Sequence, residues 1–122
     1  MYNPFRIHRV SFDHAFDGFV YAIRTQPNFR FHLLATIVVI LLGLYFSISP
    51  LEWLILVFAI NTVLVAELVN TSIEAMVDLI TLERRADAKI AKDVAAAMVL
   101  VSAALSVIVG LIVFLPKIIN LI

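Results

Sequence analysis

Long apolar runs separated by short polar stretches dominate the pattern of this chain. The three longest runs cover about 31–48, 51–70 and 94–115. Because roughly 20 apolar residues in a helix cross a 30 Å hydrocarbon layer, each run predicts a transmembrane helix. Pro50 is placed to open the second helix, and Pro116 is expected to end the third. The pattern therefore predicts an all-α membrane protein.

A different periodicity precedes the first apolar run. Between residues 12 and 26, apolar side chains recur at helical spacing and charged side chains take other positions. This predicts an amphipathic helix, which either lies along the membrane surface or packs against the chain's own bundle. Residues 1–10 are interpreted as a short, irregular, basic arm, because Pro4 disfavours a helix there. Pro27 predicts a break in the backbone before the first span.

Composition supports a membrane protein and reveals an uneven distribution of charge. Hydrophobic residues make up 63% of the 122 residues, which fit a single membrane domain (1–122), and the mean hydropathy is +1.06. The absence of cysteine excludes disulfides, thiol catalysis and thiolate metal sites. Basic residues gather before the first span and within 83–93, but not in the 47–52 turn. The positive-inside rule then places the N-terminus and the helix extension and loop at 71–93 in the cytoplasm.

A stripe of polar residues lies at the end of the second span and just beyond it. On a helix that turns about 100° per residue, its members fall on one narrow face. They are Glu67, Asn70, Thr71, Glu74 and Asp78. Ionisable groups at the edge of hydrocarbon are costly and are therefore functional candidates. Further polar residues are expected at the same membrane edge: Gln26, Asn28, Arg30, Lys92 and Asp93.

These residue types suit phosphoryl transfer between a water-soluble anion and a lipid headgroup. Carboxylates bind Mg²⁺, which commonly bridges to substrate phosphates, and a lysine supplies a compact positive charge for a phosphate. A carboxylate near hydrocarbon can accept a proton from an alcohol. The alternative is a non-catalytic membrane subunit, an assembly protein or a proton relay. A proton relay should have ionisable residues at several depths across the membrane, whereas here they gather mainly at one edge. We therefore favour a kinase.

Several other polar or aromatic residues are expected to have structural roles. The histidines, His8, His14 and His32, show no metal-site spacing and are expected at the surface or the membrane interface. Asn61 is interpreted as an interhelical hydrogen-bonding residue, and Trp53 as an interfacial anchor. The three glycines lie far apart, which excludes a glycine-rich phosphate-binding loop.

Residues 67–78, Glu-Leu-Val-Asn-Thr-Ser-Ile-Glu-Ala-Met-Val-Asp, resemble the defining segment of the small bacterial integral-membrane diacylglycerol kinases, which include undecaprenol kinases. The resemblance extends to Asn28-Phe29-Arg30-Phe31-His32 and Ala91-Lys92-Asp93, and covers roughly 12–117. It implies a homotrimeric helical bundle, with three transmembrane helices and an N-terminal amphipathic surface helix per chain, in the bacterial cytoplasmic (inner) membrane. It also implies phosphorylation of a membrane lipid alcohol by MgATP, at sites shared between subunits.

The resemblance further implies roles for individual residues. Glu67 resembles the general base that deprotonates the lipid hydroxyl, and Glu74 resembles a magnesium ligand. Where the best-known members carry a second, glutamate metal ligand on the surface helix, this chain has Gln26. The amide oxygen of Gln26 can still coordinate Mg²⁺ or contact ATP, but it brings no negative charge.

The remaining implied residues divide into two sets. Those expected at the nucleotide are Glu74, Gln26, Lys92, Asp93, Arg84 and Arg85. Those expected to shape the site or bind lipid are Asn70, Asp78, Asn28 and Arg30. The expected partners are ATP, a lipid alcohol (diacylglycerol or undecaprenol), the bilayer and further copies of the chain, with no nucleic acid. Residues 108–117 and 28–32 resemble the undecaprenol kinase branch more than the enterobacterial diacylglycerol kinases.

Overall fold

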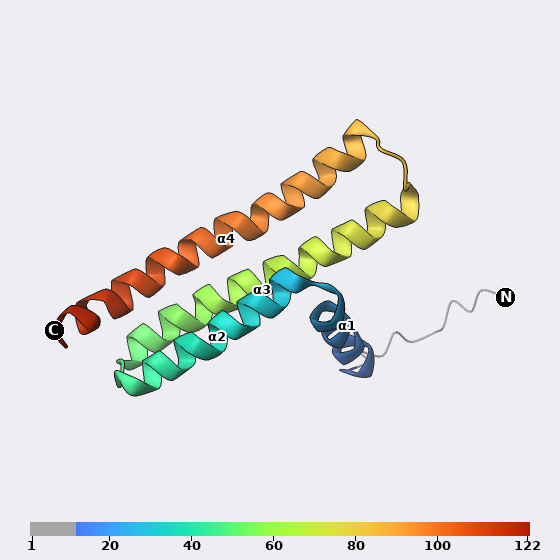
Figure 1. Ribbon diagram of the computed structural model, residues 1–122. Coiled ribbons are helices and arrows are strands. Elements are labelled where there is room, and N and C mark those ends of the chain that lie inside the picture. Colours follow the sequence, from blue (N-terminus) through green and yellow to red (C-terminus); the bar gives the residue numbers. More distant parts are fainter. Residues whose placement is uncertain (1–11) are drawn as a thin grey trace.

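The computed structural model describes residues 12–122, and the regular structure within them is entirely helical. Its helices are, in chain order, α1 (Phe12–Thr25), α2 (Pro27–Tyr45), α3 (Pro50–Ile80) and α4 (Ala86–Ile119) (Figure 1). The last three are long and apolar enough to cross a membrane. The prediction of an all-α protein with three membrane-spanning helices is therefore confirmed. The predicted basic arm at residues 1–10 lies outside the described residues.

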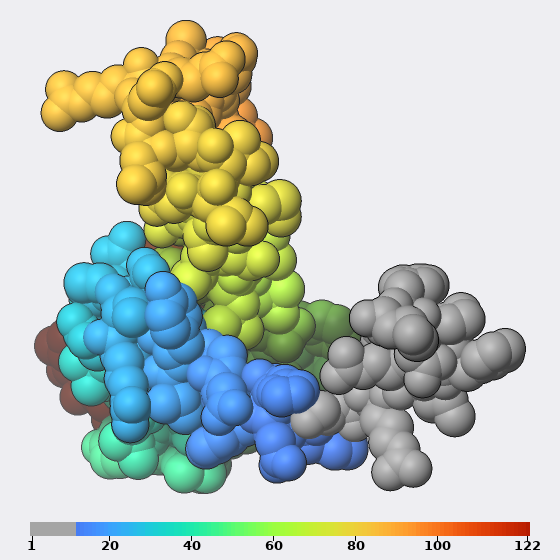
Figure 2. All heavy atoms as spheres, turned by 90° about the vertical axis from the view of Figure 1, so that its right-hand side faces the viewer, coloured from blue at the N-terminus to red at the C-terminus, as the bar shows by residue number. Residues whose placement is uncertain are grey.

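The two longest helices, α3 and α4, form an antiparallel pair, and α2 lies against the first part of α3 (Figure 1). Residues 46–49 join α2 to α3 at what we call the turn end, and residues 81–85 join α3 to α4 at the loop end. At 1.5 Å per residue, α3 is about 46 Å long and α4 about 51 Å. Both exceed a hydrocarbon layer of about 30 Å. In Figure 2 the loop end, yellow to orange, projects beyond α1 in blue.

Local sequence signals explain the turn end. Ser49 begins α3 with a capping box: its hydroxyl accepts a hydrogen bond from the Glu52 amide at 3.2 Å, and the Glu52 carboxylate accepts one from the Ser49 amide at 2.8 Å. Pro50 occupies the first turn, as the sequence predicted. The Lys117 ammonium lies 2.6 Å from the Glu52 carboxylate, so the start of α3 is tied to the end of α4.

Some helix boundaries differ from those predicted. The helix of the first span begins at Pro27, because Gln26 is extended and proline is favoured in a first turn. The prediction that Pro116 ends the third span's helix is wrong, since α4 continues through it to Ile119. Proline removes only one backbone donor, and in the last turn few hydrogen bonds remain to be lost. At its other end α4 begins at Ala86, which leaves only residues 81–85 as a loop.

Packing is closest at the turn end. Leu56, Val113 and Phe114 are buried there, and the Trp53 ring packs onto Gly43 of α2. Toward the loop end, small residues of α4 let it lie close to α3: Ala95 and Ser102 are buried. The Ser106 hydroxyl also donates to the Ala59 carbonyl across the pair at 3.1 Å.

Helix α1 combines the two arrangements left open by its sequence. Its second half packs on the bundle, because Ala22 is buried and the Phe19 ring meets the Phe29 ring edge-on at 5.4 Å between centroids. Its first half leaves Phe12 and Phe16 exposed, at 84% and 66% of their surface. That this exposed face lies on a membrane stays a prediction.

Candidate functional site

The polar stripe of α3 faces the interior of the chain and becomes exposed toward the loop end. Glu67 and Asn70 are buried, at 2% and 8% exposure, whereas Glu74 is half-buried and Asp78 is exposed. Counted from Leu51, Glu67 lies about 24 Å along the helix and Glu74 about 35 Å. A hydrocarbon layer of about 30 Å that began at Leu51, as the sequence predicts, would end between these two carboxylates. With this spacing, Glu67 could contact a membrane lipid while Glu74 contacts a water-soluble partner.

Glu67 has an unexpected neighbour on α2. The Nε2 atom of His32 lies 3.4 Å from the Glu67 Oε1, within ion-pair distance but without hydrogen-bond geometry. No described residue donates a hydrogen bond to this Oε1, which is buried. His32 was expected only at the surface or the membrane interface, and its contact with Glu67 was not predicted. The one available signal was the position of His32 at the end of the Asn28–His32 segment.

Asn70 and Glu74 form the next layer of the stripe. The Asn70 side-chain amide donates to the Glu74 Oε1 at 3.2 Å, which orients that carboxylate. The Asn70 Oδ1 is buried and accepts no hydrogen bond from residues 12–122. A carboxylate next to an unpartnered amide oxygen is a set of hard donors, and Mg²⁺ prefers hard oxygen ligands.

The oxygen donors at Glu74 and Asn70 fit Mg²⁺ bound mainly by substrate. Among residues 12–122, no group of three or more His, Cys, Asp or Glu side chains is arranged to hold a metal. Mg²⁺ often needs only one or two protein carboxylates, because waters and substrate phosphates complete its shell. Gln26 is not joined to Glu74 by a hydrogen bond in the described chain; its amide instead donates to the Thr25 hydroxyl at 3.4 Å.

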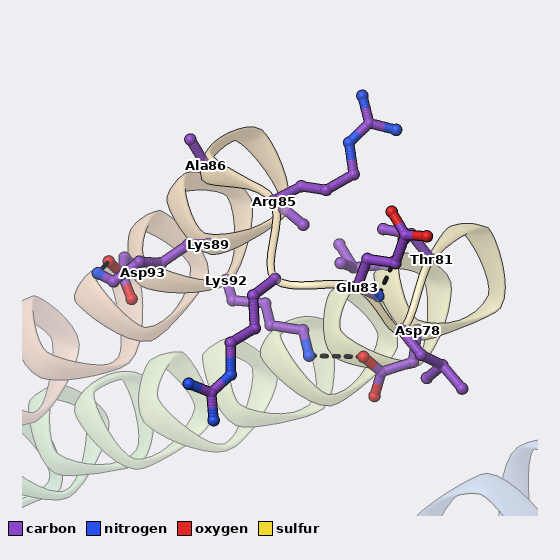
Figure 3. Close-up of a pocket in the computed structure, with 12 residues that line it drawn as sticks. Asp78, Thr81, Glu83, Arg85, Ala86, Lys89, Lys92 and Asp93 are labelled. Carbon is purple, nitrogen blue, oxygen red and sulfur yellow. Dashed lines mark hydrogen bonds and ion pairs between the residues drawn. The ribbon is translucent and has the colours of Figure 1, made fainter.

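A cavity of about 450 Å³ lies at the loop end, between the end of α3 and the start of α4. The Lys92 ammonium reaches across it to the Asp78 carboxylate at 2.5 Å (Figure 3). Lys89 forms an ion pair with Asp93 one turn further along α4. Two arginines of the loop, Arg84 and Arg85, also line the cavity. The structure thus brings together five of the residues that were expected at the nucleotide or in the site's architecture: Asp78, Arg84, Arg85, Lys92 and Asp93.

A second cavity, of about 300 Å³, lies beside Glu67. Its polar wall comes from α2 and α3 and consists of Asn28, His32, Glu67 and Asn70. Its other wall comes from α4 and is apolar: Ala96, Val99, Leu100 and Ala103. A cavity that is polar on one side and apolar on the other can hold a polar lipid head with the start of its chain. Arg30 does not join this site, because its guanidinium donates to the Ile23 and Arg24 carbonyls of α1, both at 3.3 Å.

Comparison with known proteins identifies the family to which the chain belongs. The family described as prokaryotic diacylglycerol kinase matches residues 13–114. The chain is 45% identical over 107 residues to the undecaprenol kinase of Bacillus subtilis (strain 168), covering 88% of this chain and 87% of that one. It is 38% identical over 113 residues to a diacylglycerol kinase of Synechocystis, covering 92% of this chain and 65% of the relative. The resemblance noted from residues 67–78 is confirmed, and the chain belongs to the prokaryotic diacylglycerol kinase family.

Proposed function

We propose that this protein is a lipid kinase, which transfers the terminal phosphoryl group of ATP to the hydroxyl group of a membrane lipid alcohol. The observation that carries the proposal is the position of two acidic residues on α3, one buried and one exposed. A buried carboxylate, Glu67, lies in the apolar part of α3, and Asp78 lies about 16 Å further along the helix, in a cavity lined by both cationic and acidic side chains. The names of the relatives, undecaprenol kinase and diacylglycerol kinase, support the same reaction class.

Each residue of the site has a distinct task in this reaction. Glu67 accepts the proton of the lipid hydroxyl, whose oxygen forms a bond to the terminal phosphorus of ATP while the bond to the bridging oxygen breaks and ADP leaves. Lys92 exchanges its partner Asp78 for a phosphate oxygen. Asn70 holds the Glu74 carboxylate in place. When bound by Glu74 and the free Asn70 oxygen, with Gln26 as a further contact, Mg²⁺ would offset the charge of the phosphates.

We also propose that the loop end faces the cytoplasm and that the protein is a homotrimer in the bacterial cytoplasmic membrane. Basic side chains gather at the loop end, as the positive-inside rule requires. Asn61 supports the assembly: it lies about 15 Å from Leu51 along α3, near mid-depth in a bilayer of about 30 Å. The Asn61 side chain is exposed and makes no hydrogen bond within residues 12–122. A second copy would cover this amide, which is costly in hydrocarbon.

The chemistry of the site accepts any long lipid alcohol, and we propose undecaprenol as the better acceptor. The support is the 45% identity to an undecaprenol kinase, against 38% and 35% to two diacylglycerol kinases. The cavity beside Glu67 has polar side chains on α2 and α3 but none on α4. An isoprenoid alcohol has no polar group beyond its hydroxyl, so its chain suits the apolar α4 wall.

The direct test supplies the detergent-solubilised protein with Mg²⁺, labelled ATP and either undecaprenol or diacylglycerol. We expect label in lipid with both alcohols, and more with undecaprenol. Glu67→Gln should lower turnover by at least about 100-fold, the scale of general base catalysis, without changing the oligomer. Glu52→Gln, at the other end of the same helix, is the matched control and should retain activity. Absence of transfer from the folded wild-type protein to either lipid would refute the kinase, and a fully active Glu67→Gln would refute the base.

Gln26 has its own test. Gln26→Glu should lower the Mg²⁺ concentration needed for half-maximal activity, because it adds a carboxylate where the amide contacts the metal–nucleotide complex. An unchanged Mg²⁺ requirement would show that Gln26 makes no such contact.

A further inference from the structure

The contact between His32 and Glu67 has a chemical consequence that the kinase reaction alone does not assign. The two side chains differ in their access to water: that of Glu67 is 3% exposed, and that of His32 is 19% exposed. The nearer carboxylate oxygen, Oε1, faces the Nε2 atom of the imidazole and accepts no hydrogen bond from the described chain. A proton on Glu67 therefore has an acceptor on one side and little direct access to water.

A general base must lose, in every turnover, the proton that it has accepted. The other titratable groups near Glu67 offer no outlet. On α3 the next acid of the stripe is Glu74, about 10 Å further along the helix and engaged by Asn70. On α2, Arg30 stays protonated and donates to α1. The α4 wall of the cavity carries no titratable side chain, and no residue of α1 lines it.

We propose that His32 receives from Glu67 the proton that Glu67 takes from the lipid hydroxyl, and releases it to water. This inference rests on the proposed kinase function. In the step, the carboxyl O–H bond of Glu67 breaks and an N–H bond forms at the His32 Nε2, so that a carboxylate and an imidazolium are left. The imidazolium then loses a proton to water on the side where the exposed Asn28 borders the cavity. Imidazole suits this task because it is the side chain that exchanges protons near neutral pH.

His32 acts through Glu67 and not on the substrate, so the test must separate proton transfer from a structural contact. His32→Gln keeps a polar group beside Glu67 but cannot carry a proton. We expect the turnover number to fall by about 10- to 100-fold, within or below the range for acid–base groups, while the KM for ATP stays the same. Since only neutral imidazole can accept a proton, the wild-type rate should fall at acidic pH, and the shape of this acidic limb should change in the variant, where Glu67 alone determines it.

Chemical rescue sharpens the distinction. His32→Ala leaves space at the cavity wall, and added imidazole should restore part of its activity in proportion to the concentration of the unprotonated base. His14→Gln, on the exposed face of α1, is the matched control and should behave as wild type. A fully active His32→Gln with an unchanged pH profile would overturn the proposal. Reduced activity without rescue by imidazole, and without a changed pH profile, would overturn it as well, because a packing role alone predicts that result.

A measurement independent of turnover keeps this inference separate from the kinase proposal. Nitrogen NMR of the histidine-labelled full chain at one fixed pH should show that the Nε2 resonance of His32 moves in Glu67→Gln, whereas the resonances of His14 do not, because only His32 contacts Glu67. An unchanged His32 resonance would show that the two groups are not coupled and would refute the transfer, even in an active kinase. A protein without kinase activity would refute the proposed function, and the NMR comparison would still decide the coupling.

Discussion

Gly43 of α2 is the position where the structure makes its sharpest prediction about stability. A Cβ atom built on Gly43 would lie 2.6 Å from the Trp53 Cη2, 2.8 Å from its Cζ2 and 3.2 Å from the Ile48 Cδ1. Carbon atoms pack best at about 3.5–4.0 Å, so Gly43→Ala creates an overlap of about 1 Å with a ring. Trp53 has little freedom to move aside, because it packs on the buried cluster around Leu56 and Phe114.

The expected magnitude follows from two opposing effects. Overpacking a core costs typically about 1–3 kcal/mol, and replacing glycine by alanine inside a helix returns about 0.5–1 kcal/mol. Gly43→Ala should therefore lower the free energy of unfolding by about 1 kcal/mol, and by no more than about 2.5 kcal/mol. Gly110 of α4 supplies the matched control, since nothing lies within 4 Å of a Cβ built there. Gly110→Ala should be neutral or more stable by up to about 1 kcal/mol.

Unfolding in mixed micelles, followed by far-ultraviolet circular dichroism, measures this difference. The packing explanation also predicts rescue: Trp53→Phe removes the two ring atoms nearest to the added Cβ, so the double variant should lose less than the sum of the single losses. If Gly43→Ala unfolds at the same denaturant concentration as Gly110→Ala, or if Trp53→Phe gives no rescue, the close approach of α2 and α3 at the turn end is wrong.

Three further predictions concern a helix cap, the nucleotide and assembly. Ser49→Ala removes the hydroxyl half of the capping box and should cost about 1 kcal/mol of unfolding free energy in the same assay; an unchanged midpoint would argue against the cap. Lys92→Met should raise the KM for ATP at least about 10-fold but alter stability by less than about 1 kcal/mol, because its ion pair with Asp78 is exposed. A variant with normal KM would remove Lys92 from the nucleotide site. Asn61→Leu should weaken the proposed trimer in size-exclusion light scattering, because neighbouring copies would lose their hydrogen bonds to this amide; an equally stable oligomer would place Asn61 outside the interface.

The order of helices and their role in the membrane could be predicted from the sequence alone. In hydrocarbon every backbone polar group must be satisfied within its own segment, so an apolar run of sufficient length has to be a helix. The polar stripe from Glu67 to Asp78 could also be predicted from the sequence, because the spacing of residues along a helix determines which of them share a face. The residues at which α4 begins and ends could not be predicted in this way. The extension past Pro116 depends on how little hydrogen bonding remains in a last turn, which spacing does not reveal.

Contacts between helices were decided by the tertiary structure. His32 and Glu67 belong to different helices, and nothing in their spacing places Nε2 beside Oε1; that depends on how α2 rotates and slides against α3. The pairing of Lys92 with Asp78 likewise requires the loop at residues 81–85 to return α4 along the stripe. The sequence thus determined which residues share a helix face, because one helix has a fixed geometry. Only the tertiary structure decided which faces meet, because packing between helices depends on side chains distant in the sequence.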